Sequence, residues 1–369
     1  MIDFDSRLQK LKDRRQGTRE RALIEEGLSA LSVRDPRKKE KWETNNEKPG
    51  VKYAIGAMAE VSRESTQVST SEGERVASTL NSSLETAGIP TTHRLQGSVP
   101  LNVHIEGHSD VDVLIILTKT ILVQTPKLDG TKCEAEDQRP MKDIVKELRL
   151  ESEGKLTSRY HQAKVDCSNN KSIAMSGGSL KRKVDIVPAC WYDNHKYQET
   201  RAEHDRGVHI YHKGDHKLIG NLPFTHIHLI NQKDHLYSGN LKKVIRLLKT
   251  VIADMPIYKK IDAQKLSSYD LAGISYHMDN ELKVPSYFDL ALVEKTRSHL
   301  AFLVNNPDYR DALTVPDGSR KIFDSEKKVS ALKVLHNEIE ALADAIMREI
   351  NPNKFLYDGS ILTNKMVIL

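Results

Sequence analysis

Two aspartates, Asp110 and Asp112, stand at the head of an apolar run over residues 113–117. The run has the length and the β-branched content of a buried strand, and residues two apart on a strand point to the same face of a sheet. A third aspartate, Asp185, opens a second short apolar strand that ends at Pro188. The chain is therefore predicted to contain a sheet from which three carboxylates project on neighbouring strands.

A Gly-Ser pair, Gly97-Ser98, precedes these strands. Such a turn lets backbone N–H groups approach phosphate oxygens closely, and the serine hydroxyl adds a donor. Carboxylate oxygens are the ligands that Mg²⁺ prefers, and two such ions about 4 Å apart can activate an attacking hydroxyl and stabilise a leaving pyrophosphate. An Asp-x-Asp pair alone is usually a solvated strand end. Together with the Gly-Ser turn and a third aspartate, it favours phosphoryl chemistry at two Mg²⁺ (or Mn²⁺) ions.

These residues resemble a known family. The Gly-Ser turn and the phrases HSDVDVLIIL, VDIVPA and FTHIHLINQKDHLYSGNLKKVIRLLK are similar to the nucleotidyltransferase superfamily that includes DNA polymerase beta. Within that superfamily they resemble the cGAS/DncV-like nucleotidyltransferases of bacteria. The resemblance is strongest over residues 90–117, 181–192 and 205–280. Members often follow Gly-Ser with a Gly-Thr pair, where this chain has Asn102-Val103.

The resemblance implies an activity and a set of site residues. The activity is that of a cyclic oligonucleotide synthase, which joins nucleoside triphosphates by Mg²⁺-dependent nucleotidyl transfer and releases pyrophosphate. Its product would be a second messenger in anti-phage defence of the CBASS type. By the same resemblance, Asp110, Asp112 and Asp185 are the catalytic carboxylates and metal ligands, and Gly97 and Ser98 bind the nucleotide.

A helix is predicted over residues 239–254, because apolar residues recur there at helical spacing. Its polar face carries Lys242, Arg246 and Lys249. Basic residues so placed most often form a solvated face. In cyclic GMP–AMP synthase, an analogous basic pair three residues apart meets the nucleotide triphosphate. The resemblance therefore implies that Arg246 and Lys249 hold the phosphates.

A Ser-Ser-Tyr sequence, Ser267-Ser268-Tyr269, follows about twenty residues later. It resembles a Ser-Ser-Tyr of the same enzyme, in which the tyrosine ring stacks on a base and the serine hydroxyl contacts the nucleotide. The resemblance implies these roles for Ser268 and Tyr269, and an aromatic face tolerates any base because every base has a π-face. The alternative is that Tyr269 is a core aromatic residue.

The fold class expected from this resemblance is α+β, a bilobal nucleotidyltransferase fold with a mixed twisted sheet, a long spine helix and a C-terminal helical lobe. We expect a charged N-terminal helical extension over residues 1–50, a catalytic lobe over 51–235 and a helical lobe over 236–369. Leucines and isoleucines hint that the extension packs on the body; they are Leu8, Leu11, Leu23, Ile24 and Leu28.

Three long helices are predicted from apolar periodicity and from breakers at their ends, over residues 51–87, 286–304 and 324–350. The first would be the spine helix. Seven histidines lie within residues 204–235. They match no zinc motif, and the alternation of His226 and His228 predicts a strand.

The composition fits an intracellular enzyme. The 369 residues carry a formal charge of +5, which does not by itself argue for a nucleic-acid partner. The three cysteines lack CxxC spacing, which argues against a Cys₄ zinc site and a disulfide scaffold. No long apolar run or signal core is present, so we expect a cytoplasmic protein without membrane attachment.

Two other function classes stay open at this point. One is a template-free terminal nucleotidyltransferase that acts on RNA or a small molecule. The other is a non-catalytic sensor that binds nucleic acid or a protein. The expected partners are nucleoside triphosphates as substrates, with room for a regulatory or effector protein.

Overall fold

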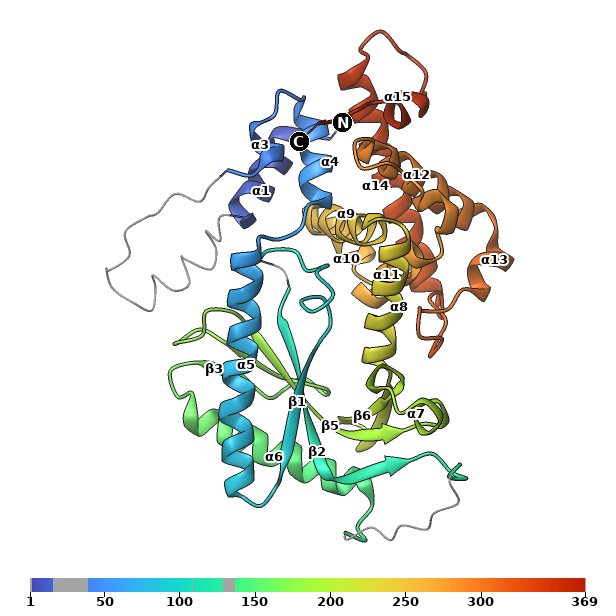
Figure 1. Cartoon of the computed structure of the whole chain (residues 1–369). Coiled ribbons are helices and arrows are strands. Elements are labelled where there is room, and N and C mark those ends of the chain that lie inside the picture. Colours follow the sequence, from blue (N-terminus) through green and yellow to red (C-terminus); the bar gives the residue numbers. More distant parts are fainter. Residues whose placement is uncertain (1, 16–38, 108, 129–136, 369) are drawn as a thin grey trace.

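The computed structural model describes residues 2–15, 39–107, 109–128 and 137–368. A sheet lobe and a helical lobe lie one above the other (Figure 1). This is the expected α+β, bilobal architecture. Within the described residues, no helix is long and apolar enough to cross a membrane.

The sheet lobe contains seven described strands, in the order β1-β2-β5-β4-β3, with β6 paired to β5 and β7 paired to β6. Only β2 and β5 run parallel to each other, so the sheet is mixed as expected. The strand bounds are β1 Thr91–Gln96, β2 Val111–Val123, β3 Lys164–Asp166, β4 Ile173–Ser176, β5 Val184–Asp193, β6 Gly207–His212 and β7 Lys217–Asn221.

The central strand β2 is buried on both faces. Val113, Ile115 and Leu117 pack into a core on one face of the sheet. Leu114 and Ile116 pack into a separate core on the other face. This double burial explains the unbroken apolar run, because a strand that has one wet face alternates between apolar and polar residues.

Two helices cover one face of the sheet: α5 (Arg63–Thr86) and α6 (Met141–Arg159). Helix α5 is the spine helix and runs along the sheet in Figure 1. The prediction of one helix over 51–87 is wrong in its first part. A separate helix α4 (Pro49–Met58) comes first, and α5 begins after Ser62, whose side chain accepts from the Ser65 N–H as an N-cap.

The helical lobe is built around α9, which is buried along almost its whole length. The predicted helices over 286–304 and 324–350 are confirmed as α12 and α14, with starts three and two residues later. The lobe contains α8 (Pro223–Leu236), α9 (Asn240–Asp254), α10 (Ile257–Ala263), α11 (Ser268–Tyr276), α12 (Asp289–Asn305), α13 (Pro307–Ala312), α14 (Glu326–Ile350) and α15 (Ser360–Thr363). Short pieces elsewhere are α7 (His195–Thr200), η1 (Glu203–Asp205) and η2 (Asp279–Leu282).

The N-terminal helices belong to the helical lobe rather than to a separate extension. Phe4, Leu8 and Leu11 of α1 (Phe4–Arg15) lie in the same core as α9 and α14, together with α3 (Lys41–Thr44) and α4. The buried pair of Arg7 and Glu338 ties α1 to α14. The structure thus divides the chain differently from the expected boundaries at 50 and 235. Leu23, Ile24 and Leu28 lie outside the described residues.

Candidate active site

Three aspartates meet at one edge of the sheet. Asp112 on β2 and Asp185 on β5 are direct partners in the parallel register, and Asp110 immediately precedes β2. Neighbouring strands lie about 4.8 Å apart, so the first two carboxylates sit side by side. All three line a cavity of about 490 Å³ between the lobes. The sequence-based prediction that they share one side of a sheet is confirmed.

The carboxylates repel one another. Burial, together with the charges of the neighbouring Asp185 and Asp110, raises the pKa of Asp112 to about 7. Burial also raises the pKa of Asp110 and of Asp185. A hydrogen bond of 3.2 Å from the Ser172 hydroxyl stabilises the charged form of Asp185 and opposes part of this effect.

Gly97 lies against Asp112. Its φ of +76° is in the left-handed region, which glycine adopts without steric cost. A Cβ at this position would stand 2.4 Å from Oδ2 of Asp112. The glycine is therefore required both by the turn and by the carboxylate. The neighbouring Ser98 lines the cavity, as the sequence predicted.

The donor set fits divalent cations by its chemistry. Divalent cations such as Mg²⁺ prefer hard carboxylate oxygens as ligands. Carboxyl groups that crowd one another have raised pKa values, and a bound divalent ion relieves their mutual repulsion. Across the described residues, no three Asp, Glu, His or Cys side chains already form a closed cage for an ion.

The polar face of α9 divides into two roles. Lys249 is 8 % exposed and lines the cavity. Burial lowers the pKa of its ammonium to about 8, and the nearby Asp112 opposes that shift. Its Nζ donates to the main-chain oxygen of Val103 at 2.9 Å. This places Lys249 beneath the Gly-Ser loop, where a phosphate-binding residue is expected.

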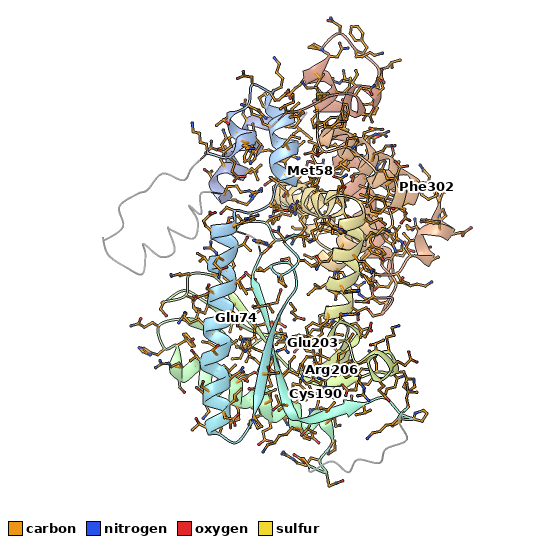
Figure 2. All side chains as sticks on the ribbon, in the orientation of Figure 1. Met58, Glu74, Cys190, Glu203, Arg206 and Phe302 are labelled. Atoms are coloured by element: carbon orange, nitrogen blue, oxygen red, sulfur yellow. The ribbon has the colours of Figure 1, made fainter. Side chains whose placement is uncertain are left out.

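Arg246 has a different role from the expected one. Its Nε donates to the Met58 carbonyl at 2.7 Å, and its Nη1 donates to the Asn102 carbonyl at 2.7 Å. Met58 ends α4, at the junction of the lobes in Figure 2. Arg246 is 2 % exposed and is absent from the described residues that line the cavity. It therefore ties the Gly-Ser loop to the helical lobe instead of facing a substrate.

Two serines at the start of α11, Ser267 and Ser268, line the cavity. We call these two residues the serine lip. Tyr269 is not among the described lining residues. Its ring stacks on His226 with centroids 3.8 Å apart and an interplanar angle of 21°. One face of the ring is therefore covered from within the protein, and the residue as a whole is only partly buried. The base-stacking and the core interpretations of Tyr269 both stay open.

His226 and His228 lie on helix α8, so the predicted strand is wrong here. Pro223 occupies the first turn of that helix, where proline is favoured. The ring of His228 stacks on His204 at 3.9 Å. In the part of the chain that the structure describes, the histidines form no metal cluster.

Sequence reasoning missed several lining residues. Lys260 and Gln264, on and just after α10, face the cavity, and so does Ser109, whose hydroxyl accepts from the Ile105 N–H at 3.0 Å. Helix α10 has only seven residues, too short to give a periodic pattern. Ser109 immediately precedes Asp110 and could have been found from that position.

The site combines carboxylates on adjacent strands with a Gly-Ser turn packed on one of them and a buried lysine from the helical lobe. This combination is typical of a nucleotidyltransferase. Comparison with known proteins gives the family. Residues 228–347 match the model of the cGAS/DncV-like nucleotidyltransferase C-terminal helical domain. A cyclic dinucleotide synthase CdnE of Yersinia aleksiciae is 34% identical over 94% of this chain and 93% of its own. The chain belongs to the cGAS/DncV-like nucleotidyltransferases.

Solved structures agree with this assignment. A STING-associated CdnE c-di-GMP synthase from Flavobacteriaceae sp. superposes with a TM-score of 0.70 at 25% identity, over 89% of this chain and 98% of its own. A second such synthase, from Capnocytophaga granulosa, gives a TM-score of 0.67 at 28% identity, over 92% of this chain and 97% of its own.

Proposed function

We propose that this protein is a cyclic dinucleotide synthase that uses nucleoside triphosphates and two Mg²⁺ or Mn²⁺ ions. The observation that carries the proposal is the register pairing of Asp112 with Asp185 at the wall of a cavity whose other side holds Lys249 and the Ser267-Ser268 lip. The names of these two relatives support the choice of a cyclic dinucleotide as product. The inferred setting is second-messenger production in the cytoplasm during anti-phage defence.

The reaction joins two nucleotides twice. A 3′- or 2′-hydroxyl attacks the α-phosphate of a second triphosphate, so a P–O bond forms, the α–β phosphoanhydride bond breaks and pyrophosphate leaves with its electron pair. The hydroxyl proton passes to a base in the cavity. The linear product then turns and rebinds, and the same exchange closes the ring.

The protein's residues would divide this work. Asp110, Asp112 and Asp185 would hold the ions, which supply Lewis-acid stabilisation of the phosphate charge when bound. Lys249 and Ser98, which both line the cavity, would bind the phosphate oxygens of the donor.

The purified protein is incubated with all four nucleoside triphosphates and Mg²⁺ or Mn²⁺, and the products are identified by mass and by resistance to phosphatase. We expect a compact, phosphatase-resistant dinucleotide, and none from the double variant Asp110→Asn, Asp112→Asn. Products that need an added acceptor would identify a terminal nucleotidyltransferase instead. No product under any condition, with nucleotide binding retained, would favour a sensor.

A further inference from the structure

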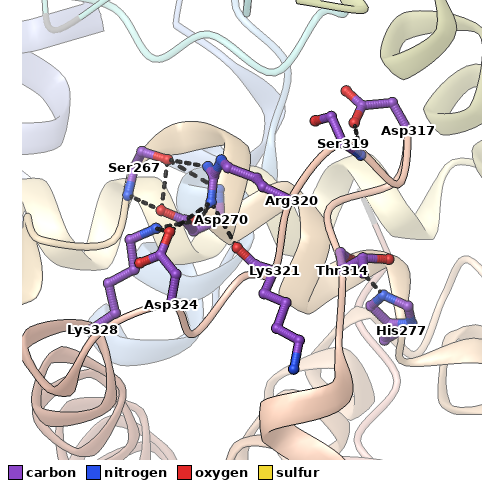
Figure 3. Close-up of polar contacts among 10 residues, drawn as sticks. All are labelled: Ser267, Asp270, His277, Thr314, Asp317, Ser319, Arg320, Lys321, Asp324 and Lys328. Carbon is purple, nitrogen blue, oxygen red and sulfur yellow. Dashed lines mark hydrogen bonds and ion pairs between the residues drawn. The ribbon is translucent and has the colours of Figure 1, made fainter.

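A short hairpin of the helical lobe, residues 313–322, closes over the first turn of α11 (Figure 3). We call it the clasp. An isolated bridge joins Thr314 to Lys321, and the Val315 N–H donates to the Arg320 carbonyl at 3.0 Å. Gly318 makes the turn with a φ of +70°. The clasp is therefore a defined element rather than a loose connection, although it lies outside the catalytic sheet.

The clasp is fixed at its base to the second half of α11. Ile322 is fully buried and packs so closely on Gly273 that a Cβ there would stand 2.7 Å from its Cδ1. The His277 ring, just after α11, lies within hydrogen-bond distance of the Thr314 carbonyl, at 2.8 Å. Both contacts hold the strands of the clasp against α11, so the clasp and α11 are expected to move as one body.

Asp270, on the first turn of α11, is the centre of the contacts in Figure 3. Its side chain is fully buried. Oδ2 accepts from the Ser267 backbone N–H at 2.8 Å and from the Ser267 hydroxyl at 2.7 Å. Oδ1 accepts from Arg320 at 2.6 Å and from Lys328 at 3.3 Å. A buried carboxylate of this kind needs such partners, because its unpaired charge would be costly.

Arg320 contacts both Asp270 and Ser267. Besides Asp270, its guanidinium lies 3.4 Å from the Ser267 hydroxyl. Ser267 and the next residue, Ser268, line the cavity. The rigid planar fork of an arginine holds two acceptors in a fixed geometry, whereas the ammonium of a lysine is a flexible point charge. The orientation of the serine lip is thus set by a residue about fifty positions further along the chain.

A second contact joins the clasp to α11 close by. Asp317 lies near the Tyr269 hydroxyl and near His226. Burial raises the pKa of the Tyr269 hydroxyl, and the charge of Asp317 adds to that effect. Burial lowers the pKa of His226 to about 4, and the charge of Asp317 opposes that shift. The clasp therefore meets the Ser-Ser-Tyr sequence on two sides, through Arg320 at Ser267 and through Asp317 at Tyr269.

We propose that Arg320 is a positioning residue for nucleotide binding, and that it acts through Asp270 to hold the Ser267-Ser268 lip against the bound nucleotide. The inference rests on the proposed function in that a nucleoside triphosphate is the occupant of the cavity. It adds the clasp to the machinery of the site, and it assigns Lys328 the lesser task of balancing the charge of Asp270.

The test measures the binding of fluorescent methylanthraniloyl derivatives of GTP and ATP to the full chain with Mg²⁺ present, alongside melting temperature. Arg320→Met should weaken binding roughly five- to fifty-fold, as expected when a binding group is misplaced by a fraction of an ångström. The melting temperature should stay close to that of the wild type, because Lys328 still pairs with Asp270. Arg320→Lys should fall between the two proteins.

A double-mutant cycle separates an indirect role from direct contact with the nucleotide. Ser267→Ala should itself weaken binding, and adding Arg320→Met should weaken it little further, because both changes act on one lip. Arg297→Met is the matched control, since Arg297 pairs with Glu294 at 2.7 Å within α12. It should lower the melting temperature and leave binding unchanged.

Three outcomes would overturn the inference. If Arg320→Met binds both probes as the wild type does, the clasp does not position the lip. Additive effects in the cycle would mean that Arg320 contacts the nucleotide directly. If the wild type binds neither probe, the proposed function fails together with the inference, whereas the first two outcomes leave the proposed function standing.

Discussion

Arg246 donates a hydrogen bond of 2.7 Å to the main-chain oxygen of Asn102, across the junction between the two lobes. Asn102 has a φ of +55°, in the left-handed region that asparagine tolerates better than most residues. The loop that carries Ser98 is thereby held by the helical lobe itself.

This relationship predicts different effects for two basic residues of α9, Arg246 and Lys249. Arg246→Met would leave the buried carbonyls of Met58 and Asn102 without their donor, and each such loss costs about 1–3 kcal/mol. We expect a clear fall in melting temperature. Lys249→Met should instead weaken nucleotide affinity by roughly 1.5–3 kcal/mol through the loss of charge-assisted bonds.

Differential scanning fluorimetry and nucleotide titration of both variants check this. A Lys249→Met protein that binds nucleotide normally would place the phosphates elsewhere. An Arg246→Met protein of unchanged stability would show that its two hydrogen bonds are replaceable by water.

The pKa of Asp112 predicts how the metal-free protein responds to pH. Its pKa rises from 3.8 to about 7 in the fold, chiefly by burial. A folded pKa above the unfolded value means that ionising the carboxyl destabilises the fold. The destabilisation is absent below about pH 4, grows as the pH rises and is complete above about pH 7.

Asp112→Asn should therefore raise the melting temperature of chelator-treated protein at pH 8 and change it little at pH 4. At roughly 1.4 kcal/mol per pKa unit, the gain at pH 8 is a few kcal/mol at most. Mg²⁺ should stabilise the wild type and no longer stabilise the variant. If Asp112→Asn lowers the melting temperature at pH 8, the repulsion among the three carboxylates is not present in solution.

Two glycines with the same backbone conformation allow the cost of backbone strain to be distinguished from a loss of activity. Gly97 and Gly88 have φ values of +76° and +79°. An added Cβ would clash with Asp112 at the first position and meet nothing within 4 Å at the second. Both Gly→Ala variants should lose about 1 kcal/mol of stability through the backbone. Only Gly97→Ala should also lose product formation in steady-state assays. Equal activity of the two variants would contradict the close approach to Asp112.

The sheet edge could be predicted from the sequence because its signals are local. An apolar run, two aspartates of the same parity and a glycine before them suffice to place Asp110 and Asp112 on one face. The helix over 239–254 was predictable for the same reason, since its apolar stripe has the helical period.

The remaining features depend on contacts that are distant in sequence. Arg246 looks like a phosphate ligand by position, but its partners are main-chain carbonyls 188 and 144 residues away, and no pattern of side chains marks them. The alternation of His226 and His228 indicated a strand, but the pattern spans only three residues. Packing of α8 against α11 and η1 overrides so short a signal. Ser62 is the N-cap of α5 and could have indicated the break before that helix. The prediction missed the break because apolar residues keep roughly helical spacing across it.

Tyr269 gives the prediction that best distinguishes a base platform from a core residue. Its buried hydroxyl lies near Asp317, and its ring is covered on one face by His226. Tyr269→Phe should therefore keep both stability and nucleotide binding, because the ring makes the contacts. Tyr269→Ala should weaken nucleotide binding by about 1–3 kcal/mol if the second face stacks on a base.

The ratio of linear to cyclic product decides between the two roles of Tyr269. A synthase must turn and rebind its linear intermediate, so a damaged platform should release more linear product for each ring closed. His226→Phe is the control, since a phenyl ring can still support Tyr269 from behind, and its ratio should match that of the wild type. If Tyr269→Ala lowers the melting temperature and the total activity while the ratio stays constant, then Tyr269 is a core residue and the base is held by other groups.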